Sequence, residues 1–213
     1  MIKYKAENPI IIIANGEYPN HHIPLNVLIN AKKIIACDGA VNLLDKNKIK
    51  PNFIIGDLDS ISNKLKVKYK KNIISIPSQK NNDFSKALNF AIKNKYNKIS
   101  ILGASGLRDD HGIGNFFRLF EYSNSISLKM YTNYGVFHFI NKKTQFPSFK
   151  GQQISIFAID KTIKISSNKL KYNLNRLMLS SLFSGTLNES VSDNFSINLT
   201  HGSIAIYQTY KTT

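Results

Sequence analysis

Apolar and polar positions in the first part of the chain form short β-branched runs that alternate with amphipathic stretches. The β-branched runs predict buried strands at residues 10–13, 33–37, 53–55, 73–76 and 98–102. The stretches between them predict helices at 25–32, 41–47, 63–71, 84–91 and 115–122, with Asp83 as the N-cap of the fourth helix. Strands that alternate with helices are typical of βα units. We therefore expect an N-terminal α/β domain with a mainly parallel, Rossmann-like sheet.

The pattern changes near residue 126, where helical spacing gives way to short strand-like runs separated by Asn, Ser, Gly and Pro. These runs lie at residues 126–131, 135–140, 153–158, 162–165, 195–199 and 203–207. Closely spaced short strands with turn residues between them predict an all-β sandwich. We therefore expect domains at 1–141 and 142–213, and the strands from 126 onward are open to either assignment.

Composition narrows the class of protein only slightly. The chain has 213 residues, of which 42% are hydrophobic, and its apolar runs are too short to span a bilayer. The start, Met1 to Lys5, is not followed by the long apolar region of a secretion signal. The single cysteine, Cys37, cannot form an internal disulfide, so a cytoplasmic protein without a membrane segment is expected.

The net charge of +16 raises the question of nucleic-acid binding. It arises from 29 Lys and Arg residues against 13 Asp and Glu residues, and the lysines are spread along the chain without a nucleic-acid-binding motif. Solvated lysine surfaces explain such a distribution, and a basic surface would also attract polyanions such as ATP. A nucleic-acid-binding protein therefore remains the less favoured alternative.

The scarce acidic residues are concentrated where strands are expected to end. Asp57 and Asp59, in Gly56-Asp57-Leu58-Asp59-Ser60, directly follow a predicted strand, which is where open α/β sheets bind ligands. Two carboxylates at this spacing can converge on one hard cation, although an ordinary polar turn would also place aspartates there. Asp38 and the pair Asp109-Asp110 follow other predicted strands, so we expect the acidic motifs at one edge of the sheet.

Basic and glycine-containing segments nearby suit a phosphate-bearing ligand. Paired aspartates together with Gly103 and Gly106 suit Mg²⁺ and phosphate, Arg108 can hold a phosphate with two hydrogen bonds, and Lys86 adds a point charge. The sequence has neither the P-loop pattern GxxxxGK[ST] nor the glycine-rich loop of protein kinases. The common nucleotide-binding classes are therefore not indicated.

Taken together, several segments resemble the thiamin pyrophosphokinase family. The segments are CDGAVN (37–42), PNFIIGDLDSI (51–61), QKNNDFSKAL (79–88), GASGLRDDHGIGN (103–115), LKYNL (170–174) and GTLNE (185–189). The resemblance implies an α/β catalytic domain, a β-sandwich domain, a homodimer, and the use of Mg²⁺ and ATP. It also implies transfer of a pyrophosphoryl group to the hydroxyl of thiamin with release of AMP.

The resemblance assigns roles to particular residues. It implies that Asp57, Asp59 and Asp83 hold Mg²⁺, that Arg108 and Lys86 balance charge on the phosphates, and that Asp110 orients Arg108 or the hydroxyl. The residues implied for ATP are Asn15, Asp38, Asn42, Gln79, Lys86, Gly103, Arg108 and Asn115. For thiamin it implies ring stacking on Tyr172 and hydrogen bonds from Thr186 and Asn188.

The sequence departs from the family pattern at several positions. Lys80 stands where the family usually has Asp, Asn82 replaces Thr, Leu107 replaces Gly, and Leu187 replaces Ser. A pyrophosphokinase for another alcohol, such as a pterin, is an alternative from a related class. It would share the first domain but not LKYNL and GTLNE.

Overall fold

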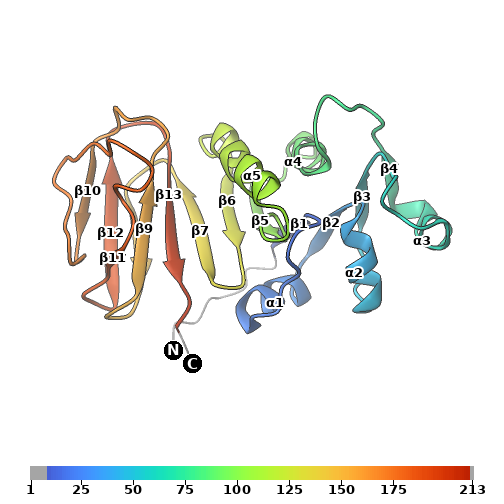
Figure 1. Cartoon of the computed structure of the whole chain (residues 1–213), viewed down its shortest axis with the longest axis horizontal. Helices are drawn as coiled ribbons and strands as arrows, with labels where there is room; N and C mark the ends of the chain where they lie inside the picture. The colour runs from blue at the N-terminus through green and yellow to red at the C-terminus, as the bar shows by residue number, and fades with distance from the viewer. Residues whose placement is uncertain (1–8, 212–213) are drawn as a thin grey trace. The chain divides into compact units, whose positions relative to one another are not determined.

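The computed structural model describes residues 9–211 (Figure 1). The segment from Met1 to Lys5, for which no secretion signal was expected, lies outside these residues. The chain divides into two compact units. The α/β unit runs to Arg118 and includes Met130–Asn133, and the β unit contains Leu119–Lys129 and the chain from Tyr134 onward. No helix among the described residues is both long and apolar enough to cross a membrane.

The sheet of the α/β unit is built from isoleucine-rich strands. These are β1 (Ile10–Ile13), β2 (Lys33–Cys37), β3 (Phe53–Gly56), β4 (Ile73–Ser75) and β5 (Lys98–Leu102). They lie in the order β5-β1-β2-β3-β4, and every pair is parallel, which confirms the predicted sheet. Ile12, Ile35, Ile54 and Ile101 are fully buried because helices cover both faces.

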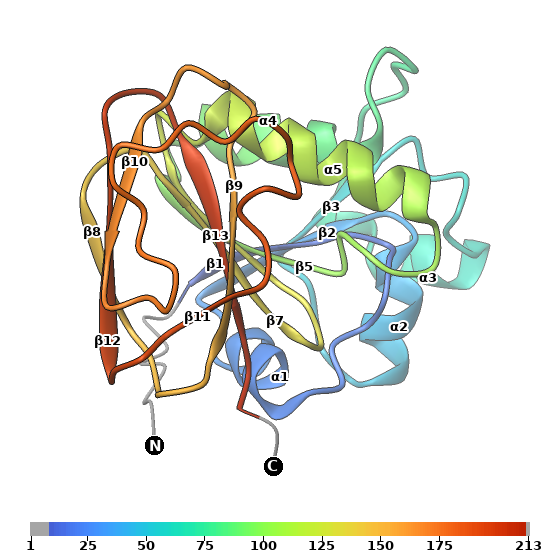
Figure 2. The same ribbon diagram turned by 60° about the vertical axis from the view of Figure 1, so that its left-hand side comes forward.

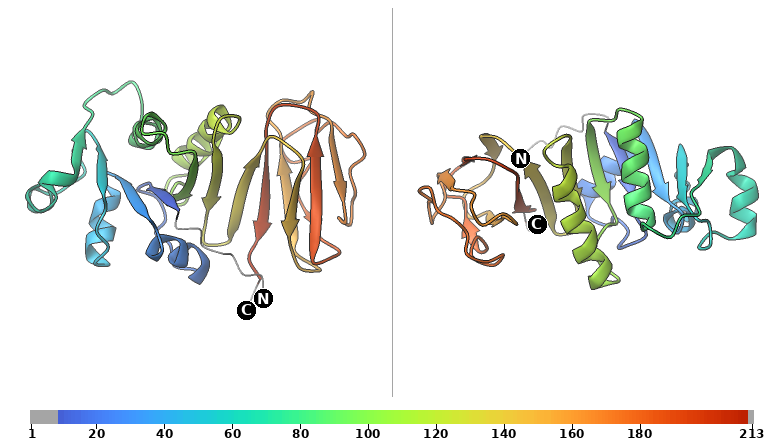
Figure 3. Two further views of the ribbon diagram at one scale, coloured as in Figure 1. Left: turned by 180° about the vertical axis from the view of Figure 1, so that it is seen from behind. Right: turned by 90° about the horizontal axis from the view of Figure 1, so that it is seen from above.

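The helices lie on both faces of this sheet. The direction in which the chain steps from strand to strand determines which face a helix covers. They are α1 (His22–Ile29), α2 (Ala40–Lys46), α3 (Asn63–Lys68), the 3₁₀ helix η1 (Lys70–Asn72), α4 (Asp83–Lys93) and α5 (Asp109–Tyr122). From β1 to β4 the chain steps in one direction across the sheet, so right-handed crossovers place α1 and α2 on one face. The step back from β4 to β5 places α4 on the other face (Figures 1 and 3).

The predicted starts of α1 and α5 were wrong for identifiable reasons. Helix α1 begins at His22 rather than at residue 25, because Pro24 lies in the first turn, where no backbone N–H is needed. Helix α5 begins at Asp109 rather than at residue 115. Ile113 is the only apolar side chain among its first seven residues, so these turns give no hydrophobic period.

The β unit contains two antiparallel sheets that share one core (Figure 2). Its strands are β7 (Gly135–Ile140), β8 (Thr144–Pro147), β9 (Gln153–Phe157), β10 (Ile165–Asn168), β11 (Asn188–Glu189), β12 (Asn194–Leu199) and β13 (Ile204–Thr209), with β6 (Ser127–Tyr131) before them. In one sheet the strands of this unit have the order β11-β9-β13-β7, and the other sheet has the order β10-β12-β8. Ile156, Phe195 and Ile206 from these two sheets pack in the shared core, as expected for a sandwich.

Several strands of the β unit differ from the prediction. β8 and β11 were not predicted, since β11 has only two residues and β8 ends in Pro147. β10 occupies Ile165–Asn168 rather than residues 162–165. Its polar sequence has little alternation of its own, and its pairing with β12 determines its position.

Candidate active site

The carboxyl ends of β2 and β3 bring three aspartates together. Carboxylate oxygens of Asp38, Asp57 and Asp59 all lie within 4.8 Å of one another. Leu58, between the latter two, has a φ of 74°, a left-handed conformation that a leucine rarely adopts. Strained residues of this kind concentrate at functional sites. The spacing of Asp57 and Asp59 predicted that they converge. The family resemblance, however, assigned Asp38 to ATP and not to this carboxylate group.

Asp38 is the buried member of the group, with 3% of its surface exposed. Its Oδ1 accepts a hydrogen bond of 2.5 Å from the Gly39 amide, and its Oδ2 accepts one of 3.1 Å from the Leu58 amide. Burial, followed by the negative charge of Asp83, raises the pKa of Asp38 to about 6. Buried negative charge of this kind favours the binding of a cation.

Gly56 makes the close approach of β2 and β3 possible. A Cβ atom at this position would lie 2.8 Å from the Cβ of Asp38, well inside van der Waals contact. Only glycine therefore fits while Asp38 keeps its place.

Asp57 is held by neighbours that favour its charged form. Gln79 donates a hydrogen bond of 2.9 Å from Nε2 to Asp57 Oδ2, and the Asp59 amide donates one of 3.3 Å to Oδ1. The hydrogen bond from Gln79, with a smaller contribution from the Lys86 charge, lowers the pKa of Asp57. Asp57 is therefore ionised whenever the protein is near neutral pH.

Lys86 lies inside the site although it belongs to helix α4. It is 5% exposed, and its Nζ lies 2.7 Å from Asp83 Oδ1 and 4.0 Å from Asp57 Oδ2. A buried ammonium group between carboxylates offsets part of their charge.

Lys80, the largest departure from the family pattern, precedes helix α4 in the sequence, and its side chain is exposed.

The N-cap of α4 is Asn82, not Asp83, which corrects the sequence prediction. Asn82 accepts a hydrogen bond of 2.9 Å from the Ser85 amide, and Asp83 is the first helical residue. The Asn82 side chain also donates to Asn115 Oδ1 at 3.2 Å, and buried Asn115 donates to the Ala104 carbonyl at 3.0 Å. The cap therefore joins α4 to α5 and frees Asp83 to contact Lys86.

The segment after β5 presents Arg108 to solvent. Gly103, Gly106 and Leu107 have positive φ values of 61°, 73° and 67°. Arg108 donates two hydrogen bonds to Asp110, from Nε to Oδ1 at 3.1 Å and from Nη2 to Oδ2 at 2.6 Å. Arg108 lowers the pKa of Asp110 to about 2. The guanidinium keeps further N–H groups for an incoming phosphate.

Two exposed asparagines complete this edge of the sheet. Asn42 Nδ2 donates to the carbonyls of Gly39 and Ser60, each at 3.1 Å. The Asn15 side chain lies against Gly39, because a Cβ atom added to Gly39 would be 2.3 Å from the Nδ2 of Asn15. These contacts connect the ends of β1, β2 and β3, which the sequence alone did not predict.

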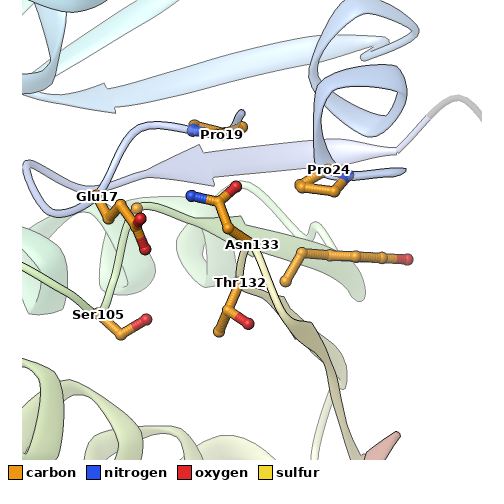
Figure 4. Close-up of a pocket in the computed structure, with 8 residues that line it drawn as sticks. Glu17, Pro19, Pro24, Ser105, Thr132 and Asn133 are labelled. Atoms are coloured by element: carbon orange, nitrogen blue, oxygen red, sulfur yellow. The ribbon is translucent and has the colours of Figure 1, made fainter. Parts of the chain in front are cut away.

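A small hollow lies beside the Gly103 segment, within the α/β unit. The side chains of Glu17, Pro24 and Asn133 are arranged around it (Figure 4). The Glu17 amide donates to the Ser105 carbonyl at 2.8 Å, and Asn133 Nδ2 donates to the Tyr18 carbonyl at 3.1 Å. These hydrogen bonds connect the segment after β1 to the segments after β5 and β6.

The residues predicted to bind thiamin lie in the β unit. The Tyr172 side chain is 62% exposed, and Asn188 is 6% exposed. Asn188 exchanges two hydrogen bonds with the main chain of Tyr172. Thr186 donates a hydrogen bond of 2.7 Å to the Phe183 carbonyl. Tyr172 and Asn188 thus lie together in the fold, and the roles of Tyr172, Thr186 and Asn188 toward thiamin stay predictions.

A parallel sheet with phosphate-compatible charges at its carboxyl edge is the architecture of many α/β enzymes that act on nucleotides. Comparison with protein families defines this chain further. Residues 25–131 match the model for the thiamin pyrophosphokinase catalytic domain, and residues 135–207 match the thiamin pyrophosphokinase substrate-binding domain. The chain belongs to the thiamin pyrophosphokinase family. It is an enzyme with the catalytic and substrate-binding domains of a thiamine diphosphokinase, and neither alternative considered above is favoured.

Solved structures show the same fold. A thiamin pyrophosphokinase family protein from Enterococcus faecalis aligns with a TM-score of 0.81 at 16% identity, covering 96% of this chain and 100% of its own. Thiamine pyrophosphokinase from Bacillus subtilis gives 0.76 at 19% identity, with 96% and 100% covered. The yeast enzyme gives 0.77 at 20% identity, with 98% and 88% covered. None of the curated protein sequences compared with this chain matches it.

Proposed function

We propose that this protein transfers the pyrophosphoryl group of ATP to the hydroxyl of thiamin. The thiamin oxygen attacks the β-phosphorus, the bond from that phosphorus to the oxygen bridging to the α-phosphate breaks, and AMP leaves as the hydroxyl loses its proton. The observation that carries the proposal is the presence of both family domains on a chain whose Asp38, Asp57 and Asp59 gather at the strand ends.

The carboxylate group fits Mg²⁺. Its oxygens are hard ligands that lie within 4.8 Å of one another, and burial, followed by the charge of Asp83, raises the pKa of Asp38, a cost that a divalent cation would relieve. We assign Asp57 and Asp59 as direct ligands, with Asp38 and Asp83 beside them. Bound Mg²⁺ would neutralise charge on the transferred phosphates.

The chain's own cations and amides would position ATP. Lys86, between Asp57 and Asp83, supplies a fixed point charge, and Arg108 supplies a forked set of donors that Asp110 holds in orientation. Further contacts to ATP are assigned to Asn15, Asp38, Asn42, Gln79, Gly103 and Asn115. Alignment of the attacking hydroxyl with the departing AMP supplies much of the rate.

The thiamin site is assigned to Tyr172 and Thr186 in the β unit. An exposed aromatic face suits a cationic thiazolium and a flat pyrimidine. Because Tyr172 and Asp57 belong to different units, we assign the complete site to a homodimer, in which Asp57 of one protomer and Tyr172 of its partner form each active site. The buried, unpaired Cys37 is consistent with a reducing, cytoplasmic location.

The test is product identification. The protein is incubated with thiamin, ATP and Mg²⁺, and the products are separated and quantified. Thiamin diphosphate and AMP in equal amounts are expected. ADP with thiamin monophosphate would contradict the proposal, and a pterin alcohol tested in parallel should not be turned over. Salt-dependent binding of an oligonucleotide without any turnover would instead favour the nucleic-acid alternative.

A further inference from the structure

Tyr172 combines an exposed ring with a fixed backbone. Its amide donates a hydrogen bond of 3.1 Å to Asn188 Oδ1, and its carbonyl accepts one of 2.7 Å from Asn188 Nδ2. Both main-chain groups of an exposed aromatic are thus held by one side chain. This arrangement orders the residue before any ligand arrives.

Asn188 has little hydrogen-bonding capacity left for a ligand. It lies on β11 and is 6% exposed, and its Oδ1 also accepts a hydrogen bond of 2.8 Å from the Glu189 amide. Its oxygen therefore has both acceptor sites filled, and only one N–H remains. The side chain serves the main chain around it.

Lys171, paired with Glu189, lies over one face of the Tyr172 ring. Lys171 Nζ lies 5.8 Å from the ring centroid and 3.7 Å from Glu189 Oε2, and the Lys171 amide donates to the Glu189 carbonyl at 2.8 Å. An ammonium group over one face already uses the attraction between cation and aromatic ring. It would also repel a second cation from that face, so a cationic flat ligand must use the opposite one.

We propose that Asn188 is a positioning residue, which fixes Tyr172 as a platform with one open face for a flat cationic ring and does not itself bind the ligand. This inference rests on the proposed function and deepens it. Ordering the aromatic residue in the free protein removes part of the entropic cost of binding. Lys171, held by Glu189, restricts the ring to a single binding face.

A double-mutant cycle tests this mechanism. Steady-state kinetics with thiamin are measured for Tyr172→Ala, Asn188→Ala and the double variant at saturating ATP and Mg²⁺. Tyr172→Ala is expected to raise the KM for thiamin about tenfold, the loss of one aromatic–cation contact. Asn188→Ala should raise the same KM to a similar extent with little change in kcat. The double variant should be no worse than Tyr172→Ala alone, because Asn188 acts through Tyr172.

Two further variants separate positioning from folding. Asn188→Asp keeps the acceptor oxygens and loses the Nδ2 donor, so its KM should lie between those of the native protein and Asn188→Ala. Asn198→Ala, at an exposed position of β12, should leave the KM for thiamin unchanged. Thermal unfolding and the KM for ATP confirm that each variant is folded.

The outcomes distinguish this inference from the proposed function. Additive KM effects in the cycle would mean that Asn188 contacts thiamin directly and would overturn the positioning role. An unchanged KM in folded Asn188→Asp and Asn188→Ala, or in Tyr172→Ala with turnover intact, would overturn it while leaving the activity in place. If the native protein neither binds nor converts thiamin, the proposed function fails and the inference fails with it.

Discussion

The ammonium group of Lys86 lies 2.7 Å from the Asp83 carboxylate, and both groups lie at the start of helix α4. Lys86 is buried, so its loss would leave Asp83 and the nearby Asp57 without a compensating charge. We expect Lys86→Met to lower kcat by about 10²-fold through lost charge stabilisation. It should also lower the free energy of unfolding by about 1.5–3 kcal/mol, the usual range for a charged hydrogen bond.

The matched control for this variant is Lys93→Met. Lys93 lies in the last turn of the same helix and is exposed. Urea unfolding and steady-state kinetics should show little change in the control. Equal losses in both variants would mean that net charge, and not the position of Lys86, matters.

The two carboxylates after β3, half-buried Asp57 and exposed Asp59, are expected to be the most sensitive to isosteric change. Asp57→Asn and Asp59→Asn keep side-chain size but remove a charge from the group that also contains Asp38. Each should lower kcat by on the order of 10²–10³, as for the loss of one electrostatic contact to the transition state. Calorimetric titration with Mg²⁺ alone should show weaker binding in both.

Asp193→Asn provides the control for these variants, because Asp193 is an exposed acid of the β unit. It should titrate with Mg²⁺ like the native protein. Near-normal turnover of both Asp57→Asn and Asp59→Asn at limiting Mg²⁺ would show that these residues only shape the turn.

Replacing Gly56 should disturb Asp38 without touching any charge. A Cβ at position 56 would lie 2.8 Å from the Asp38 Cβ and 2.9 Å from its Cγ, so the strand or the carboxylate must move. We expect Gly56→Ala to cost about 1–3 kcal/mol of stability, as in other overpacked sites. Weaker Mg²⁺ binding should accompany this cost. Gly114→Ala is the comparison, since nothing lies within 4 Å of a Cβ there, and alanine in helix α5 should raise stability by about 0.5–1 kcal/mol.

The pairing of Asp110 with Arg108 predicts that the contribution of Asp110 to kcat/KM does not change with pH near neutrality. The hydrogen bonds from Arg108 lower the pKa of Asp110 to about 2, below the ordinary value of about 3.9 for Asp. The stability that the pair supplies is therefore complete above pH ~4 and is lost only as the pH falls through about 2. Between about pH 5 and 9 the carboxylate stays ionised and is a poor general base.

Kinetics of Asp110→Asn across that range provide the check. The ratio of native to variant kcat/KM should be the same at each pH, with Arg108 merely less well oriented. A ratio that rises or falls between about pH 5 and 9 would show that Asp110 exchanges a proton during the reaction.

Sequence reasoning succeeded where local chemistry and periodicity point the same way. The strands Lys33–Cys37 and Lys98–Leu102 and the parallel sheet were predicted correctly, because β-branched runs bounded by polar turns have few other stable arrangements. The acids at strand ends were located for the same reason. The α4 cap was misassigned because Asn82 and Asp83 are both good caps, and the hydrogen bond from Asn82 to Asn115, which favours Asn82, is tertiary.

The remainder of the site depends on contacts between residues far apart in the sequence. Asp38 joins the carboxylate group only because Gly56 lets β2 and β3 approach closely, and a sequence pattern does not show this distance. Likewise, Asn188 was assigned to the ligand because its motif resembles a binding motif. Its bonds to Tyr172, 16 residues away, become visible only in the folded β unit.

The homodimer assignment predicts complementation between two defective variants. If Asp57 of one protomer and Tyr172 of its partner form each active site, a mixed dimer of Asp57→Asn and Tyr172→Ala chains contains one site with neither change and one site with both. Random exchange of equal amounts makes half of the dimers mixed, so activity should recover to about a quarter of the native value. The measurement uses thiamin below its KM, after the two proteins are mixed and given time to exchange subunits. Light scattering establishes the mass, and exchange is verified with differently tagged chains. A monomeric mass, or no gain in activity after verified exchange, would place the whole site within one chain.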